Sequence, residues 1–329
     1  MPRSNAFREV TAKARCAICD SDHWCQVTLD GGFAMCRRVA EGGRYRLDRN
    51  GSPYWIHRLS GEARPVRHPS AHLDATADRA SAALLDEVYR TALGELGLSR
   101  EHQQYLSTPW PAGKSLPPEE VVRRGYASLP PAGPPWRREE VARRLVERFG
   151  AEALAGVPGF VQKERRWRPG VHYWTVAGAD GLLVPVRDAA GLVVALLVRA
   201  DHPRNPRDKY LWLTSKSAGG PSPGSRAHVP LPRSEVPAVP GTVSVYEGIL
   251  KADCAAALDP ASLPAVGIPG HSSWRAALPI LQQLGASAVR YYPDPDAWEK
   301  PAVGQSLKAF WKALKDEGFS VELGRFAGC

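Results

Sequence analysis

The sequence lacks several features that would place it in other classes of protein. No run of about 18 apolar residues occurs in its 329 residues, so neither a transmembrane helix nor a membrane partner is expected. The opening segment MPRSNAFREV lacks the apolar region of a secretory signal, so a cytoplasmic location is expected. No P-loop pattern GxxxxGKS/T occurs, which argues against a helicase motor in this chain.

Cysteine is scarce and unevenly distributed. Two of the six cysteines, Cys254 and Cys329, are isolated, and the other four fall within 21 residues. In a reducing cytoplasm such a cluster is typical of a metal site rather than of a disulfide set.

The spacing of the clustered cysteines fits a zinc ribbon. Cys16-Ala-Ile-Cys19 has the two-residue gap that lets both thiolates face one ion. Cys25 and Cys36 flank QVTLDGGFAM, two β-prone runs around a turn, so a hairpin would bring them together opposite the first pair. Four thiolates would then hold structural Zn²⁺ at distances of about 2.3 Å. His23 is an alternative to Cys25, although the hairpin favours Cys25.

The net charge of +9 is distributed unevenly. Lys and Arg outnumber Asp and Glu by 12 to 7 in residues 1–70 and by 23 to 18 in residues 71–239, whereas residues 240–329 hold 8 against 9. A basic surface attracts polyanions, because each neutralised phosphate releases counterions. Arg37 and Arg38 follow the last clustered cysteine, where they could contact a phosphate backbone or simply be solvated.

Composition and periodicity divide the chain into four parts. Residues 1–60 form the small zinc-binding module, and a polar, Pro- and His-containing linker follows at 61–77. Residues 78–240 are first helical and then β-rich, which predicts an α+β subdomain. Residues 241–329 alternate strands with helices, which predicts an α/β domain.

The α+β subdomain at 78–240 is expected to contain three helices and a hairpin. The helices are predicted at 84–98, 119–124 and 138–149, with Gly150 as a left-handed cap. GLLVPVRDAAGLVVALLVRA (181–200) is two β-rich runs joined by Asp188-Ala-Ala-Gly191.

Four short apolar runs in the last domain alternate with helical segments. The runs are 242–246, 264–268, 287–292 and 319–323, and the helical segments are 249–258, 273–284 and 303–317. Parallel neighbours need a crossover of about a dozen residues, so this alternation predicts a parallel sheet flanked by helices.

Acidic residues follow two of these strands. Glu247-Gly248 comes directly after the first, and Asp294-Pro295-Asp296 comes after the third. The carboxyl ends of parallel strands share one edge of the sheet, where ligands bind. Converging carboxylates repel one another unless a cation lies between them, and Mg²⁺ prefers such oxygen ligands. The alternative is a turn with helix-capping acids and a surface glutamate.

These segments resemble a known family. VSVYEGILKADCAAAL, AVGIPGHSSW and AVRYYPDPDA are similar to the Toprim domain of bacterial replicative primases, topoisomerases and some nucleases, and more narrowly to the Toprim-like domains of phage and plasmid replication proteins (the DUF3854 type). GLLVPVRDAAGLVVALLVRA and KYLWLTS resemble the core of DnaG-like primases. CAICD, WC, CRRV and WIHRL are similar to the zinc ribbon that precedes such cores. The resemblance covers roughly residues 14–60 and 180–323.

The resemblance implies a DNA primase that joins ribonucleotides or deoxyribonucleotides on single-stranded DNA, with a separate replicative helicase as partner. It casts Glu247, Asp294 and Asp296 as the catalytic acids that bind Mg²⁺ or Mn²⁺. It also implies that Arg199 and Lys209 contact nucleotide phosphates or template. The alternatives are a Toprim nuclease using the same metal and a non-catalytic DNA-binding replication module.

The sequence departs from the family pattern at two places. Many primases carry an Asp four residues after the Glu, whereas this chain has Lys251, as in the plasmid-type group, and Lys251 is expected to contact nucleotide or DNA. The family also has a further acidic pair after the next strand, where this sequence reads Val321-Glu-Leu-Gly-Arg-Phe. One metal site is therefore expected, and a second stays open.

Overall fold

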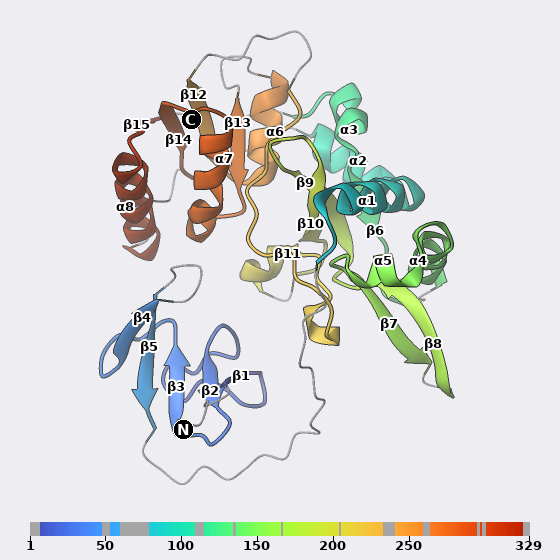
Figure 1. The fold of residues 1–329 in the computed structure, drawn as a ribbon, viewed down its shortest axis with the longest axis horizontal. Helices are drawn as coiled ribbons and strands as arrows, with labels where there is room; N and C mark the ends of the chain where they lie inside the picture. The colour runs from blue at the N-terminus through green and yellow to red at the C-terminus, as the bar shows by residue number, and fades with distance from the viewer. Residues whose placement is uncertain are drawn as a thin grey trace. The chain divides into compact units, whose positions relative to one another are not determined.

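The computed structural model describes residues 7–47, 53–59, 79–108, 115–133, 136–165, 167–203, 205–232, 241–258, 264–294, 297 and 301–324. The chain divides into two compact units (Figure 1), residues 1–72, called unit 1 below, and residues 73–329, called unit 2. Within the described ranges, no helix combines the length and apolar character needed to cross a membrane.

Unit 1 contains a five-stranded antiparallel sheet in the order β1-β2-β3-β5-β4. The strands are β1 (Phe7–Glu9), β2 (Gln26–Thr28), β3 (Phe33–Cys36), β4 (Arg44–Leu47) and β5 (Pro53–Arg58). β2 and β3 form the hairpin expected from the sequence. Its turn places Gly31 at a φ of 70°, and Gly32 N–H donates to Asp30 Oδ1 at 3.0 Å. Glycine tolerates this left-handed conformation without steric cost.

Unit 2 begins with helices that cover an antiparallel sheet. They are α1 (Ala82–Leu96), α2 (Arg100–Ser107), α3 (Pro118–Arg124), α4 (Trp136–Phe149) and α5 (Ala151–Ala155). The Ser81 hydroxyl caps α1 by accepting from the Leu84 N–H, and Leu85, Val88 and Leu96 bury one face of this helix. Gly150 has a φ of 88° but an extended ψ, and it precedes α5 rather than forming the expected left-handed cap.

The antiparallel sheet has the order β11-β10-β9-β6. Its strands are β6 (Ala127–Leu129), β9 (Gly181–Arg187), β10 (Val193–Ala200) and β11 (Tyr210–Trp212). β9 and β10 form the predicted hairpin, whose turn is held by Asp188 Oδ1 accepting from the Ala190 and Leu192 N–H groups. All seven residues of β9 are buried, since helices cover both of its faces.

A separate two-stranded ribbon, β7 (Phe160–Arg165) with β8 (Arg168–Val176), projects from α4 and α5 (Figure 1). The sequence pattern did not predict this ribbon.

The C-terminal part of unit 2 is built on a four-stranded parallel sheet in the order β13-β12-β14-β15. Its strands are β12 (Thr242–Glu247), β13 (Ala265–Ile268), β14 (Ala288–Tyr292) and β15 (Ser320–Leu323), and its helices are α6 (Ile249–Leu258), α7 (Ala277–Gln283) and α8 (Pro301–Asp316). Val243 and Val245 of β12 pack with α7 and α8, whereas Tyr246 packs with α6. Successive side chains of a strand point to opposite faces, so helices cover both sides of the sheet.

The fold class expected from the sequence is confirmed. A parallel sheet flanked by helices follows an α+β subdomain, and a small unit with clustered cysteines precedes both. The helix expected at 273–284 instead begins with a 3₁₀ segment, His271–Ala276, and continues as α7. The three boundaries that the sequence predicts between the four parts of the chain stay a prediction.

Candidate functional site

Two of the three predicted carboxylates meet at one edge of the parallel sheet. β12 ends at Glu247, and β14 ends two residues before Asp294. The strands are parallel neighbours with Tyr246 opposite Tyr292, so their carboxyl ends coincide. The Asp294 N–H donates to Glu247 Oε2 at 3.4 Å. Asp296, the third predicted acid, lies outside the described residues.

Gly248 makes the turn that directs the chain from β12 into α6. Its φ of 115° is a conformation that side-chain-bearing residues rarely adopt. A Cβ on Gly248 would meet the Lys251 side chain at 3.4 Å. The Glu-Gly pair therefore has a physical reason: the acid is the last residue of the strand, and the glycine allows the chain to leave the sheet.

His271 also joins the site and was not predicted from the sequence. It follows β13, and its N–H donates to Glu247 Oε1 at 3.1 Å. Its Nδ1 atom is buried without a hydrogen-bond partner among the described residues. The position of GHSSW directly after an apolar run was a usable signal, because that run ends at the same sheet edge.

The electrostatics of the edge favour a cation. Burial and, secondly, the charge of Asp294 raise the pKa of Glu247. Lys251 forms an ion pair with Asp294 Oδ1, so one ammonium already lies against the carboxylates. The donors are hard carboxylate oxygens, the type that Mg²⁺ and Mn²⁺ bind. Glu247 and Asp294 therefore fit a divalent metal, and Lys251 reduces the negative charge that this metal must balance.

A buried ionic network fixes α6 behind this edge. Asp253 on α6 is 1% exposed and accepts from Arg124 Nη1 at 2.5 Å and from Tyr126 Oη at 2.6 Å. His228 Nε2 lies 3.2 Å from the same carboxylate. Although burial opposes it, the Arg124 guanidinium and the hydrogen bonds from His228 and Tyr126 hold the pKa of Asp253 well below its usual range. The network ties the helix that follows Glu247 to α3 and to the segment before β12.

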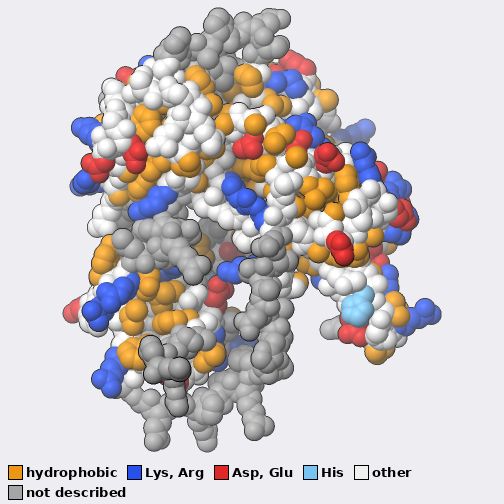
Figure 2. All heavy atoms as spheres, in the orientation of Figure 1, with side chains coloured by type: hydrophobic (Ala, Val, Ile, Leu, Met, Phe, Trp, Pro, Cys, Tyr) orange, Lys and Arg blue, Asp and Glu red, His pale blue; other side chains and the backbone are white. Residues whose placement is uncertain are grey.

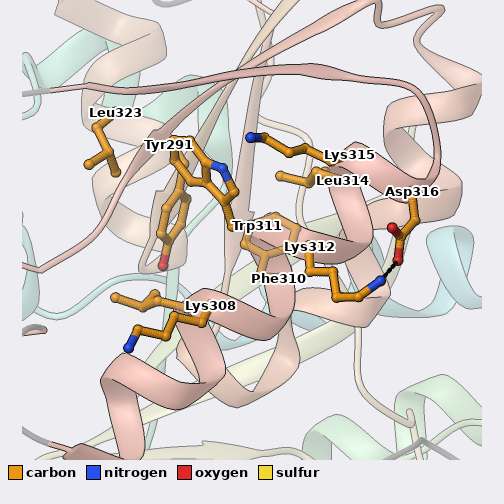
Figure 3. A pocket seen from close by; sticks show the side chains of 10 residues that line it. Tyr291, Lys308, Phe310, Trp311, Lys312, Leu314, Lys315, Asp316 and Leu323 are labelled. Atoms are coloured by element: carbon orange, nitrogen blue, oxygen red, sulfur yellow. Dashed lines mark hydrogen bonds and ion pairs between the residues drawn. The ribbon is translucent and has the colours of Figure 1, made fainter.

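A separate cavity of about 380 Å³ lies between α8 and the outer strand β15 (Figure 3). It is lined by Tyr291, Leu307, Lys308, Phe310, Trp311, Lys312, Leu314, Lys315, Asp316 and Leu323. Neither Glu247 nor Asp294 lines it, so it is not the candidate catalytic site.

The predicted phosphate-binding residues lie on the antiparallel sheet. Arg199 is on β10, with its Cζ atom 4.0 Å from the centre of the Tyr105 ring and opposite Tyr210 in the strand pairing. Lys209 is exposed and precedes β11. Among the described residues, no hydrogen bond or ion pair joins Arg199 or Lys209 to Glu247. Their role toward phosphate stays a prediction.

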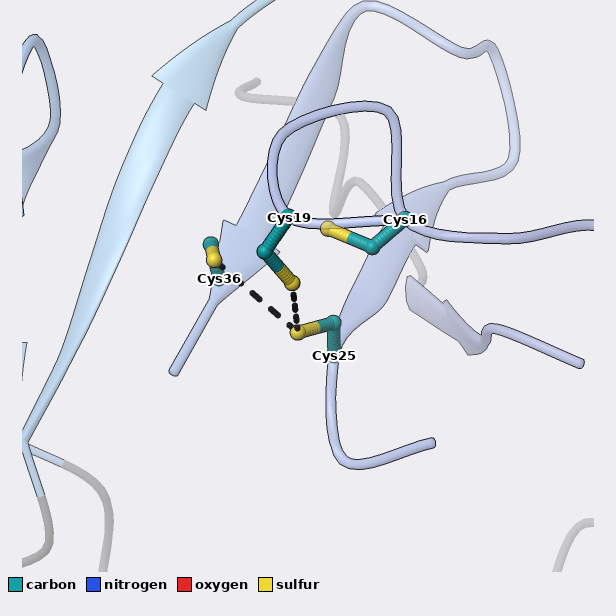
Figure 4. A group of neighbouring side chains, drawn as sticks. All are labelled: Cys16, Cys19, Cys25 and Cys36. Carbon is teal, nitrogen blue, oxygen red and sulfur yellow. Dashed lines mark hydrogen bonds between the residues drawn. The ribbon is translucent and has the colours of Figure 1, made fainter. Parts of the chain in front are cut away.

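The four clustered cysteines of unit 1 come together as the spacing predicts (Figure 4). Their sulfur atoms all lie within 4.8 Å of one another. Cys19 Sγ is 3.6 Å from Cys25 Sγ, and Cys25 Sγ is 4.0 Å from Cys36 Sγ. A tetrahedron with Zn–S bonds of about 2.3 Å has edges of about 3.8 Å, so the arrangement fits zinc. Burial raises the pKa of the Cys25 thiol and so disfavours its thiolate, whereas bound zinc would stabilise the thiolate.

The remaining residues of interest in unit 1 lie around this cluster. His23 is not among the grouped ligands: its Nδ1 lies 2.5 Å from Asp22 Oδ1 and its Nε2 lies 3.0 Å from Arg38 Nη2. The Arg37 guanidinium lies 6.0 Å from the Tyr54 ring centre. Contacts of Arg37 and Arg38 with nucleic acid stay a prediction.

The fold is similar to that of crystallised bacterial primases. The zinc-binding and RNA polymerase domains of the Aquifex aeolicus primase match with a TM-score of 0.50 and 17% identity, over 73% of this chain and 55% of that one. The RNA polymerase domain of the Mycobacterium tuberculosis primase DnaG matches with a TM-score of 0.47 and 18% identity, over 75% of this chain and 76% of that one. A DNA primase domain from Pseudomonas aeruginosa matches with a TM-score of 0.46 and 15% identity, over 73% of this chain and 70% of that one.

This chain thus spans about half of the Aquifex aeolicus structure, 55% of its length. No protein-family model and no curated protein sequence matches the chain. At such low identity, the likeness concerns the fold.

Proposed function

We propose that this protein is a DNA primase that synthesises short oligonucleotide primers on single-stranded DNA at a Toprim-type carboxylate site. The observation that carries the proposal is the meeting of Glu247 and Asp294 at the carboxyl edge of the parallel sheet. The primase-like fold supports the same reading, because it combines this sheet with an α+β subdomain. The four-cysteine cluster supports a structural zinc site in unit 1.

The carboxylates would act together by holding the catalytic metal ion. Glu247 and Asp294, with Asp296 as the expected third ligand, would hold Mg²⁺ or Mn²⁺. A divalent ion there neutralises triphosphate charge and polarises the reacting phosphate oxygens. Glu247 is partly buried, and its raised pKa makes it suited to take the proton of a primer 3′-hydroxyl. Binding metal and accepting this proton are alternative roles for Glu247.

The cationic residues would bind the substrates. Arg199 and Lys209 would hold nucleotide phosphates or template, and Lys251 would contact nucleotide or DNA from beside Asp294. Arg37 and Arg38 would contact the template through unit 1. The substrates are NTPs or dNTPs, and a separate replicative helicase is the expected partner.

A primer-synthesis assay tests this function. The full chain is incubated with labelled NTPs or dNTPs, a single-stranded template and Mg²⁺ or Mn²⁺. We expect short oligonucleotides from the wild type and at least about 100-fold less from Asp294→Ala, because the metal would lose a ligand. Glu322→Gln is the matched control, since this acid is exposed on β15 and pairs with Arg290 at 2.6 Å. It should leave synthesis unchanged.

Other outcomes separate the alternatives. Metal-dependent cleavage of DNA without synthesis would favour a Toprim nuclease. DNA binding without either reaction would favour a non-catalytic replication module. Equal synthesis by Asp294→Ala and wild type would contradict the proposed site even if the protein is a primase.

A further inference from the structure

The outer half of the β7–β8 ribbon has no core beneath it. Within β8, the residues from Arg168 to His172 are all exposed, although neighbouring side chains point to opposite faces. In β7, Gln162 to Glu164 are exposed in the same way. A two-stranded ribbon gains little stability of its own in water. This segment is therefore held out from unit 2 with both faces open to a partner (Figure 1).

The charges on the ribbon favour an anionic partner. Arg165 is directly opposite Arg168 in the strand pairing, an arrangement of like charges that is destabilising. Arg165 is neutralised by Glu139 at 2.7 Å, and Glu164 is occupied by the Gly170 N–H at 2.6 Å. Lys163 and Arg168 have no ion pair within the described part of the chain. Figure 2 shows a mixture of Lys or Arg, His, acidic and hydrophobic side chains at the far end of the ribbon.

An aromatic side chain lies among these cations. Trp167, in the turn of the ribbon, is 70% exposed. The Arg165 guanidinium lies 5.5 Å from the Trp167 ring centre and 4.4 Å from that of Tyr173. The Arg165 guanidinium therefore contacts both rings, while the indole stays open to solvent. A large exposed ring surrounded by cations suits an unpaired base attached to phosphates.

We propose that the outer half of the β7–β8 ribbon is a binding arm for single-stranded nucleic acid. Trp167 stacks on an unpaired base, and Lys163 and Arg168 contact the phosphates on either side of it. Phosphate charge neutralises Lys163 and Arg168, and the stacked base covers the exposed indole. The arm is separate from Glu247 and Asp294, so it can be tested without nucleotides and without Mg²⁺.

Fluorescence anisotropy of a labelled oligothymidylate tests the arm in the full chain. Trp167→Ala should weaken binding by about 5- to 100-fold, because one base–aromatic stack is lost. Trp136→Ala is the matched control, since Trp136 is 59% exposed on α4. The double variant Lys163→Ala/Arg168→Ala should reduce the slope of log K against log salt by about 1.4, since each phosphate contact on a single strand contributes about 0.7. Arg100→Ala/Arg143→Ala removes the same charge from α2 and α4.

The outcomes decide the proposal. Equal weakening by the two double variants would mean that only net charge matters and would overturn it. So would unchanged affinity in Trp167→Ala, or weakening that affects duplex DNA but not the oligothymidylate. Circular dichroism confirms that each variant is folded. Binding is measured without synthesis. The results can therefore contradict the arm proposal while the primase proposal holds, or contradict the primase proposal while the arm proposal holds.

Discussion

Asp253 illustrates how much stability one buried side chain can control. Its carboxylate accepts hydrogen bonds from Arg124 and Tyr126, and the Arg124 side chain is 0% exposed. Replacing Asp253 with Ala removes one of the two carboxylates that pair with the buried Arg124, the other being Glu120 at 2.9 Å, and breaking a buried ion pair typically costs about 3–5 kcal/mol. We expect Asp253→Ala to lower the free energy of unfolding by this amount in a urea titration.

The control for this substitution is Asp316→Ala. Asp316 is also an acid on a helix of unit 2, but its partner Lys312 and its own side chain are exposed, so the change should stay within about 1 kcal/mol. Similar losses in the two variants would show that the buried network contributes no more than a surface ion pair.

His228 gives the same network a pH dependence. The Arg187 N–H donates to His228 Nδ1 at 3.0 Å, which leaves Nε2 to donate to Asp253. Burial lowers the pKa of His228 below 6.5 and outweighs the attraction of Asp253, so the folded imidazole is neutral. The unfolded chain takes up a proton below about pH 6.5, so stability falls as the pH decreases, by up to about 1.4 kcal/mol per unit.

The low pKa of Asp253 affects stability in a different pH range. An acid with a depressed pKa stabilises the fold above its unfolded value, so this contribution is lost only below about pH 4. His228→Gln should therefore flatten the decrease in unfolding free energy between pH 7 and 5, measured by urea titration. The exposed His172→Gln should keep the wild-type slope. Parallel slopes in all three proteins would contradict a neutral, buried His228.

At the scale of an element, the turn from β12 to α6 depends on one glycine. Gly248→Ala forces a side chain into a φ of 115°, a strain of about 1–3 kcal/mol, and its Cβ would contact the Lys251 side chain. We expect lower stability and weaker Mn²⁺ binding, measured by urea titration and by electron paramagnetic resonance. Gly304→Ala on α8 is the control, because an added Cβ there has no neighbour within 4 Å. It should stabilise the helix slightly. A fully tolerated Gly248→Ala would show that the turn is not strained.

Apolar runs carried most of the fold prediction. The run at 242–246 corresponds to β12 and the helical segment at 249–258 to α6, because buried parallel strands read as continuous apolar stretches. The edge shared by Glu247 and Asp294 follows from this alternation alone.

The elements that escaped prediction lack such a pattern. The outer half of the β7–β8 ribbon has both faces in solvent, so its sequence QKERRWRPGVHY shows no alternation of apolar and polar residues. Asp253 and Arg124 are 129 positions apart, and no local pattern pairs residues at that distance. His271 was missed because its contact with Glu247 uses the backbone N–H, which any residue supplies.

At the scale of the whole molecule, the two units should differ in what holds them together. The buried cluster of unit 1 consists of Val10 with three cysteines, Cys16, Cys25 and Cys36, whereas unit 2 has extensive apolar cores. A small module with so little apolar core depends on its metal for folding energy. We expect purified protein to contain about one zinc per chain, and Cys36→Ser to contain almost none.

Loss of zinc should unfold unit 1 and leave unit 2 intact. After treatment with a chelator, limited proteolysis followed by mass spectrometry should show digestion within residues 1–72 and a stable fragment that begins near residue 73. Cys254→Ser is the matched control, since Cys254 is buried in α6 outside the sulfur cluster. It should retain zinc and resist digestion of unit 1. A wild type that binds no zinc would refute the four-cysteine site, and loss of both units on chelation would mean that the metal also stabilises unit 2.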